Sequence, residues 1–364
     1  MACLTCLTRY AIIEYNSNDM NINVSKLTKA VLSQLEAKQR DVLENRYGLS
    51  DGAVKTLAEI GEKYHITRER VRQIESVAIK EVLKNKDSVE MADFVSLVKN
   101  HLKNVGGVRR DVLLLSDLKL MIADPNSPHL GNKVRFLLET AGEPRLVSED
   151  NNFYAYWHLG EDEKRKAQDF SNKLVKLMDK QRGTVVSHQN IDSVLSEATK
   201  PHNFKDLVAL NYVSLSKQFH INHYGDFGLA SWPEVNPKNM KDWAYSVLKK
   251  QNKPLHFGEI TKFINKVCDN KIAHPQTVHN ELIKDERFVL VGRGTYGLKE
   301  FGIMPGTAKE VLANLIKQHG PLSPKELISL VLKERVFKKN TILINLQNRK
   351  HFKRLEDGKY ATLV

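Results

Sequence analysis

Residues 56–82, TLAEIGEKYHITRERVRQIESVAIKEV, contain the signals for two helices joined by a tight turn. Thr56 and Glu59 have the spacing of a capping box, in which the threonine hydroxyl caps the helix and the glutamate reaches back to the threonine amide. A short helix is therefore expected, ending in a turn at Tyr64–Ile66. Thr67 is expected to cap a second helix, whose apolar positions recur at helical spacing: Val71, Ile74, Ala78 and Val82.

The polar face of this second helix carries side chains that suit the edges of DNA bases. Arginine can make a bidentate pair with guanine, glutamine can do so with adenine, and glutamate can accept a hydrogen bond from cytosine. Two helices of this kind form a helix–turn–helix, which places the N-terminal part of its second helix in the major groove. We expect the DNA-facing side to carry Arg68, Glu69, Arg72, Gln73 and Ser76.

A longer run, from Leu32 to Leu83, resembles region 4 of housekeeping-type bacterial RNA polymerase sigma factors. The resemblance rests above all on Tyr47-Gly48-Leu49, on Glu59-Ile60-Gly61 and on the block TRERVRQIE from Thr67 to Glu75. It implies a helix that reads the minus-thirty-five promoter element of double-stranded DNA, in a module that docks on the β flap of the polymerase core. By position in the motif, it assigns base contacts to Arg68, Glu69, Arg72 and Gln73 and backbone contacts to Thr67 and Arg70.

The resemblance covers residues 26–84 of a 364-residue chain. We therefore expect the chain to lack the promoter-melting and polymerase-clamping regions of a full sigma factor. It is expected to act as a regulator that borrowed the module, as a partner of a split sigma factor, or as a factor that engages polymerase without melting DNA.

Two stretches in the last third share one plan of three helices closed by a hairpin. Pro254 and Ile260 are six residues apart in the first stretch, and Pro321 and Leu327 are six apart in the second. This is the plan of a winged helix. The first stretch resembles HARE-type helix–turn–helix domains, which occur in the δ subunit of bacterial RNA polymerase, in restriction endonucleases and in chromatin proteins.

Fainter copies of the same plan precede these two, so the predicted fold is mostly α with small β-hairpins. The predicted organisation is an N-terminal extension at 1–23, a sigma-like helix–turn–helix at 24–86, and tandem winged helices at 88–160, 165–236, 239–303 and 304–364.

The net charge of +13 favours a polyanionic partner, and it is unevenly spread. Residues 241–364 have 23 Lys and Arg against 12 Asp and Glu, whereas residues 1–240 have 33 against 31. Long-range attraction to DNA is therefore expected to come from the repeats. A basic cluster suited to phosphate contacts, or alternatively to a solvated helix face, comprises Lys338, Lys339, Arg349, Lys350, Lys353 and Arg354.

The sequence contains no convincing motif for catalysis, metal binding or cofactor binding. Gly292–Gly297 satisfies G-x-G-x-x-G, but no helix is expected directly after it, so it is interpreted as a hairpin turn. Asp357–Lys359 is also interpreted as a turn, and the lone pair of Cys3 and Cys6 is too small for structural zinc. We expect a chain that is not an enzyme and that needs no cofactor and no metal.

The sequence also predicts where the chain works and what it does. It has no apolar run of membrane-spanning length, no secretion signal and only three cysteines, which predicts a cytoplasmic, nucleoid-associated protein without a membrane partner. The leading hypothesis is a DNA-binding transcription factor that acts with bacterial RNA polymerase in initiation or its regulation. The alternatives are a polymerase- or protein-binding scaffold and the DNA-targeting component of a restriction or defence system. The oligomeric state is left open.

Overall fold

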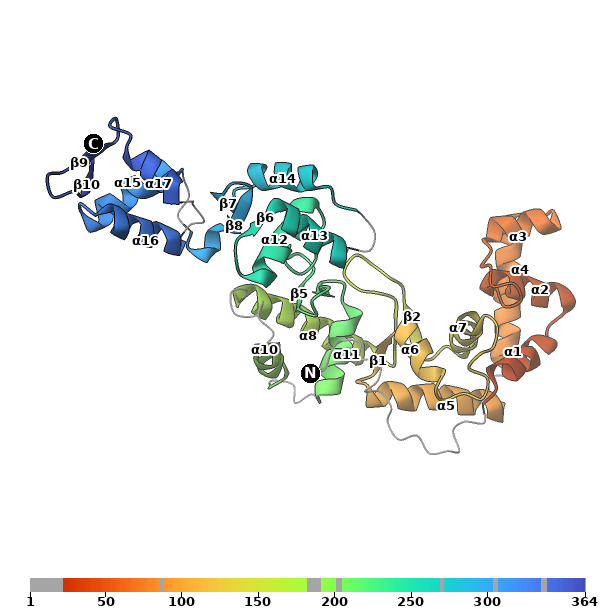
Figure 1. Ribbon diagram of the computed structural model, residues 1–364. Coiled ribbons are helices and arrows are strands. Elements are labelled where there is room, and N and C mark those ends of the chain that lie inside the picture. Colours follow the sequence, from red (N-terminus) through yellow and green to blue (C-terminus); the bar gives the residue numbers. More distant parts are fainter. Residues whose placement is uncertain are drawn as a thin grey trace. The chain divides into compact units, whose positions relative to one another are not determined.

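The computed structural model describes residues 22–84, 88–181, 191–200, 205–268, 272–303, 307–334 and 339–363. As predicted, these residues are mostly helical, with small antiparallel sheets (Figure 1). They divide into two compact units. The first contains residues up to Ile221 and 225–229, and the second contains 222–224 and 230–364. Among the helices in the described ranges, none combines the length and the apolar character that a membrane span requires.

In the described residues the first unit begins with four helices: α1 (Val24–Ser33), α2 (Ala37–Tyr47), α3 (Leu57–Tyr64) and α4 (Arg68–Lys84). The predicted capping box is present at the start of α3. The Thr56 hydroxyl accepts from the Glu59 amide at 3.2 Å, and the Glu59 carboxylate accepts from the Thr56 amide at 2.6 Å. His65 takes the left-handed backbone conformation that ends α3, with φ of 53°. The predicted apolar stripe of α4 is confirmed, because Val71, Ile74, Ala78 and Val82 are all buried.

Three more helices and a small sheet follow in the same unit: α5 (Val89–Asn104), α6 (Asp111–Leu118) and α7 (Leu130–Ala141), with β1 (Val108–Arg110), β2 (Arg145–Val147) and β3 (Tyr156–His158). The strands are antiparallel and lie in the order β1-β3-β2. These elements form the stretch 88–160, which the sequence predicted to be a domain separate from the helix–turn–helix at 24–86.

The structure joins the two stretches in one hydrophobic core. A single cluster of buried side chains contains Leu27 of α1 and Ala78 of α4 together with Phe94 of α5 and Leu137 of α7. A separate and much smaller cluster holds α3 against α2 and the first half of α4, and consists of Val42, Ile60, Val71 and Ile74. The apolar side chains of α1 and of the second half of α4 belong instead to the larger cluster, which they share with α5–α7.

The rest of the first unit contains α8 (Glu161–Lys180), α10 (Ile191–Thr199), α11 (Asp206–Leu215) and a hairpin of β4 (Phe219–Ile221) and β5 (Phe227–Leu229). A buried polar network ties α11 to β1 and α6. Asn211 accepts a hydrogen bond from Arg109 at 3.0 Å and donates to the carbonyl oxygens of Val105 and Val108. Arg109 also donates two hydrogen bonds to Asp117. The predicted stretches 88–160 and 165–236 are therefore linked through buried groups.

The second unit begins with a helix, a short strand, two helices and a hairpin. These are α12 (Met240–Gln251), β6 (Leu255–His256), α13 (Phe257–Val267), α14 (Pro275–Lys284), β7 (Phe288–Gly292) and β8 (Thr295–Leu298), followed by the 3-10 turn η4 (Lys299–Phe301). The strand order is β6-β8-β7. The G-x-G-x-x-G run lies at the β7–β8 turn, where Gly294 has φ of 68°, so its interpretation as a hairpin turn is confirmed.

The chain repeats this order in α15 (Ala308–His319), α16 (Pro324–Glu334), α17 (Lys339–Leu346), β9 (Phe352–Arg354) and β10 (Tyr360–Thr362). Leu322 forms an isolated bridge with Tyr360 at the position that β6 takes in the preceding stretch. Gly358 has φ of 80° between β9 and β10, which confirms the predicted turn. Each stretch has its own hydrophobic cluster. The assignment of either one as a winged-helix domain stays a prediction.

Candidate nucleic-acid interface

The first turns of α4 separate an apolar side from a polar side. The Thr67 hydroxyl accepts a hydrogen bond from the Arg70 amide at 3.3 Å, and the Thr67 carbonyl accepts from the Val71 amide at 3.1 Å. Thr67 therefore begins the helix, as its position in the sequence predicts. Val71 lies in the small core against α2 and α3. The opposite side of the same turns is open to solvent, and its side chains are Arg68, Glu69, Arg70, Arg72 and Gln73.

Four of these exposed side chains pair with one another along the helix. Arg72 donates two hydrogen bonds to Glu69, at 2.9 and 2.6 Å, and Arg70 donates one to Gln73 at 3.0 Å. Both pairs have the spacing of three residues that brings helical side chains together. Arg72 and Glu69 remain 59% and 57% exposed, so their pairing is weak and DNA can replace it at small cost.

Ionisation of Glu69 suits its predicted role as a hydrogen-bond acceptor. The hydrogen bond from Arg72 lowers the pKa of the Glu69 carboxyl against the opposing effect of desolvation, and the positive charges of Arg72 and Arg68 lower it further. The carboxylate is therefore charged at neutral pH. It offers acceptor oxygens to an exocyclic amine of cytosine.

Four hydrogen bonds that the sequence did not indicate, made by Arg46 and Asp41, hold the helix–turn–helix in shape. Arg46 donates to Glu75 of α4 at 3.2 Å and to the carbonyl oxygen of Lys55 at 3.1 Å, so it joins α2, the α2–α3 turn and α4. Asp41 accepts hydrogen bonds from Lys63 and Tyr64 at the end of α3. These pairs are distant in sequence, so helical spacing gave no signal for them.

The second predicted contact surface lies at the C-terminal end of the second unit. Lys339 is the first residue of α17, Arg349 and Lys350 lie in the turn after it, and Lys353 and Arg354 belong to β9. All five are exposed, and in the described part of the chain none pairs with a carboxylate. The sixth predicted member, Lys338, lies outside the described residues. Five unpaired cations on one helix, turn and strand can contact phosphates.

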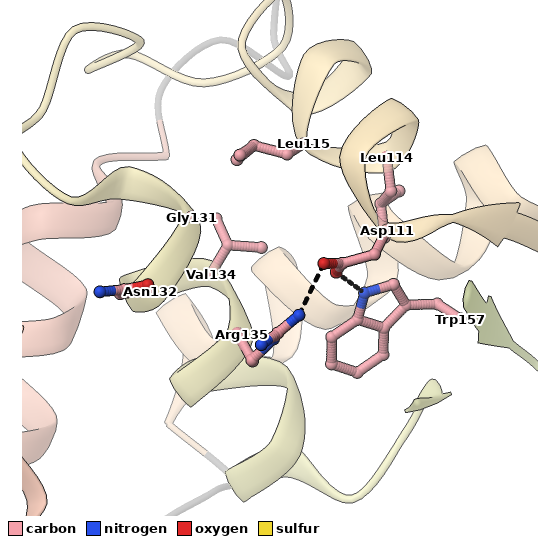
Figure 2. Close-up of a pocket in the computed structure, with 8 residues that line it drawn as sticks. All are labelled: Asp111, Leu114, Leu115, Gly131, Asn132, Val134, Arg135 and Trp157. Atoms are coloured by element: carbon pink, nitrogen blue, oxygen red, sulfur yellow. Dashed lines mark hydrogen bonds and ion pairs between the residues drawn. The ribbon is translucent and has the colours of Figure 1, made fainter. Parts of the chain in front are cut away.

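A small hollow between α6 and α7 shows no sign of a ligand site. Figure 2 shows Asp111 between Arg135 and Trp157, and the carboxylate accepts a hydrogen bond from each at 2.7 Å. The hollow has a volume of about 140 Å³, whereas pockets for small-molecule ligands are at least roughly 300 Å³. In the described ranges no group of three or more His, Cys, Asp or Glu side chains could hold a metal ion. Cys3 and Cys6 lie outside the described residues.

The comparisons with known proteins concern the helix–turn–helix. The family model "Sigma-70, region 4" matches residues 31–82. RNA polymerase sigma factor SigA1 of Synechococcus elongatus is 54% identical over 54 residues, which are 15% of this chain and 14% of that protein. Sigma factor SigA of Nostoc sp. is 54% identical over 52 residues, which are 14% of this chain and 13% of that protein. SigA of Lactococcus lactis subsp. cremoris is 40% identical over 65 residues, 18% of each chain.

The chain spans less than a fifth of the length of these relatives. The resemblance to region 4 is confirmed over residues 31–82, and the exposed face of α4 lies within that match. The resemblance of residues 239–303 to HARE-type domains stays a prediction.

Proposed function

We propose that this protein is a DNA-binding transcription factor that acts with bacterial RNA polymerase in transcription initiation or its regulation. The observation that carries the proposal is the exposed face of α4 in a stretch similar to sigma-70 region 4. Arg68, Glu69, Arg72 and Gln73 would choose the base sequence in the major groove, and Thr67 and Arg70 would contact the backbone.

The second unit would add affinity that does not depend on sequence. Lys339, Arg349, Lys350, Lys353 and Arg354 would contact phosphates, and two linked binding surfaces on one DNA molecule raise the overall affinity. This role fits the predicted HARE-type and winged-helix character of 239–303 and 304–364. We further propose that the chain is not an enzyme and that it acts in the cytoplasm at the nucleoid.

Selection of bound DNA from a random pool, with and without core RNA polymerase, tests both partners. The full chain alone is expected to enrich one short motif. With core polymerase the same motif should be recovered at a lower protein concentration, because a second binding partner on the complex raises its affinity. Enrichment of no motif under either condition would contradict the proposal.

A polymerase- or protein-binding scaffold is the second candidate. One observation favours it: α17, which we expect near DNA, exposes Ile344 at 67% and Leu343 at 37%. Apolar side chains next to one another on an exposed helix suit a protein partner better than a phosphate backbone. On the scaffold account, DNA binding would be weak and would depend little on salt.

A further inference from the structure

Helix α7 holds the turn that links α2 to α3 in the helix–turn–helix. The side-chain amide of Asn132 donates to the carbonyl oxygen of Gly48 at 2.9 Å and to that of Gly52 at 3.3 Å. Gly48 ends α2 in the left-handed conformation, with φ of 61°. A Cβ atom at Gly48 would lie 2.9 Å from the Asn132 amide nitrogen, so α7 approaches this turn as closely as a glycine permits.

Contacts on either side of Asn132 in the sequence also hold α7 against the helix–turn–helix. The Asp124 carboxylate, in the loop before α7, accepts hydrogen bonds from the amides of Val24 and Ser25 at 2.8 and 2.9 Å and so caps α1. Phe136, one helical turn after Asn132, packs edge-on against Tyr47. Glu139, two turns after Asn132, accepts a hydrogen bond from the Tyr47 hydroxyl at 2.9 Å. The helix–turn–helix is therefore held at both α1 and the end of α2.

The turn that α7 holds is connected to the DNA-facing helix. Arg46 binds the carbonyl oxygen of Lys55 and the carboxylate of Glu75 in α4. Lys55 directly precedes Thr56, which caps α3. A shift of the α2–α3 turn would therefore move both the start of α3 and the contact that aligns α4.

The charge of this part of the chain does not favour a DNA surface of its own. Residues 88–160 contain eight Lys and Arg against nine Asp and Glu, a net charge of −1, whereas residues 24–86 contain thirteen against nine, a net charge of +4. Ion pairs already hold three of the eight cations: Lys99, Arg109 and Arg135.

We propose that residues 89–160 form a platform that positions the DNA-reading helix, and that Asn132 is its principal positioning residue. This inference rests on the proposed function. It gives the predicted winged helix at 88–160 a contact with α1, α2 and the α2–α3 turn of the same chain, and no phosphate contact.

The test compares three variants of the full chain. Asn132→Asp keeps the side-chain shape but removes both N–H donors and sets a carboxylate against two carbonyl oxygens. Tyr47→Phe removes one hydrogen bond and keeps the ring contact with Phe136. Arg135→Gln is the matched control, because it lies on the same helix but binds Asp111 of α6 (Figure 2).

For Asn132→Asp we expect amide hydrogen exchange over residues 48–64 to rise about 10-fold, because the loss of each hydrogen bond lowers the opening free energy of the turn. The ratio of specific to non-specific DNA affinity should fall about 5- to 10-fold while non-specific binding is unchanged. Tyr47→Phe should change both quantities in the same direction by a smaller factor. Arg135→Gln should change neither.

Unaltered exchange over residues 48–64 in Asn132→Asp would overturn the inference, as would equal changes in Asn132→Asp and Arg135→Gln. Equal losses of specific and non-specific binding would also overturn it. Loss of the platform contact should reduce the preference for one DNA sequence and should leave the phosphate contacts intact. A wild-type chain that selects no DNA sequence would instead contradict the proposed function. The exchange measurement needs no DNA, so it tests the platform separately.

Discussion

Among single residues, Arg72 is expected to contribute most directly to the choice of DNA sequence. It lies on the exposed face of α4, where its two hydrogen bonds to Glu69 leave its side chain 59% exposed. Replacement by alanine should weaken binding to the selected DNA site roughly 10- to 100-fold and relax the preference at one base position. Fluorescence anisotropy with the selected site and single-base variants measures both effects.

Lys80→Ala provides the control for Arg72, since Lys80 is exposed on the same helix beyond the first turns. It should reduce affinity for all sequences equally or not at all. A loss of preference in Lys80→Ala that matched the loss in Arg72→Ala would show that the base-contacting residues have been assigned wrongly.

Local signals in the sequence predicted many of the single-residue features. The capping box of Thr56 and Glu59 and the buried stripe of α4 depend only on spacing within one helix, so they were predictable. The pairing of Arg72 with Glu69 also follows from their spacing of three residues along one helix. Contacts such as Asn132 with Gly48 join residues 84 positions apart, and no local pattern indicates them.

At the level of elements, a charged cluster ties α12 to the start of β7. Arg287 donates to Asp285 at 2.7 Å and to Asp242 of α12 at 3.0 Å. The hydrogen bond from Arg287, against the opposing effect of desolvation, lowers the pKa of Asp285 below its usual value. An aspartate whose pKa is lowered on folding stabilises the protein above its unfolded pKa of about 3.9, and this stability is lost as pH falls through the lower folded pKa.

Asp285→Asn should therefore lower the free energy of unfolding of residues 240–301 by about 1.5–3 kcal/mol at pH 7 and at pH 5. The difference from wild type should shrink as pH falls through the lowered pKa of Asp285. Thermal unfolding followed by circular dichroism over this pH range measures it. Glu286→Gln is the control, because Glu286 is 96% exposed and should have little effect at any pH. A constant difference across all pH values would contradict the assignment.

A second prediction at this level concerns the buried network of β1, α6 and α11. Arg109 is 1% exposed and bridges Asp117 and Asn211. Its replacement by methionine would remove two hydrogen bonds from the buried Asp117 carboxylate, which His101 of α5 also contacts at 2.8 Å, and should cost about 3–5 kcal/mol of unfolding free energy. Because the network joins the two parts of the first unit, hydrogen exchange in α5 and in α11 should rise together. An increase confined to one of these helices would show that they unfold independently.

For the whole molecule, the basic cluster of the second unit should set the salt dependence of DNA binding. Neutralising Lys339, Arg349, Lys350, Lys353 and Arg354 should reduce the slope of log affinity against log salt by up to about 0.9 for each phosphate that is no longer bound. Lys317→Gln with Lys325→Gln is the control, since both side chains are exposed on α15 and α16 of the same stretch. An unchanged slope in the five-site variant would favour the scaffold.

The chain as a whole was less predictable than its parts. Hairpin turns at Gly294 and Gly358 and the helix order of the last third were accessible from glycine placement and repeat spacing. The shared core of the helix–turn–helix with α5–α7 was not, because a periodic apolar face shows that a helix is buried without showing what buries it. The candidate site was predictable because its residues lie within two helical turns, whereas the platform that holds it comes from distant segments.

On the proposed function, the first two turns of α4 choose the DNA sequence. Selection from a random DNA pool with the wild-type chain and with Arg68→Ala combined with Arg72→Ala tests it most directly. We predict that the wild type enriches one motif, while the double variant still binds DNA at low salt but enriches none. Enrichment of the same motif by the double variant would contradict the claim.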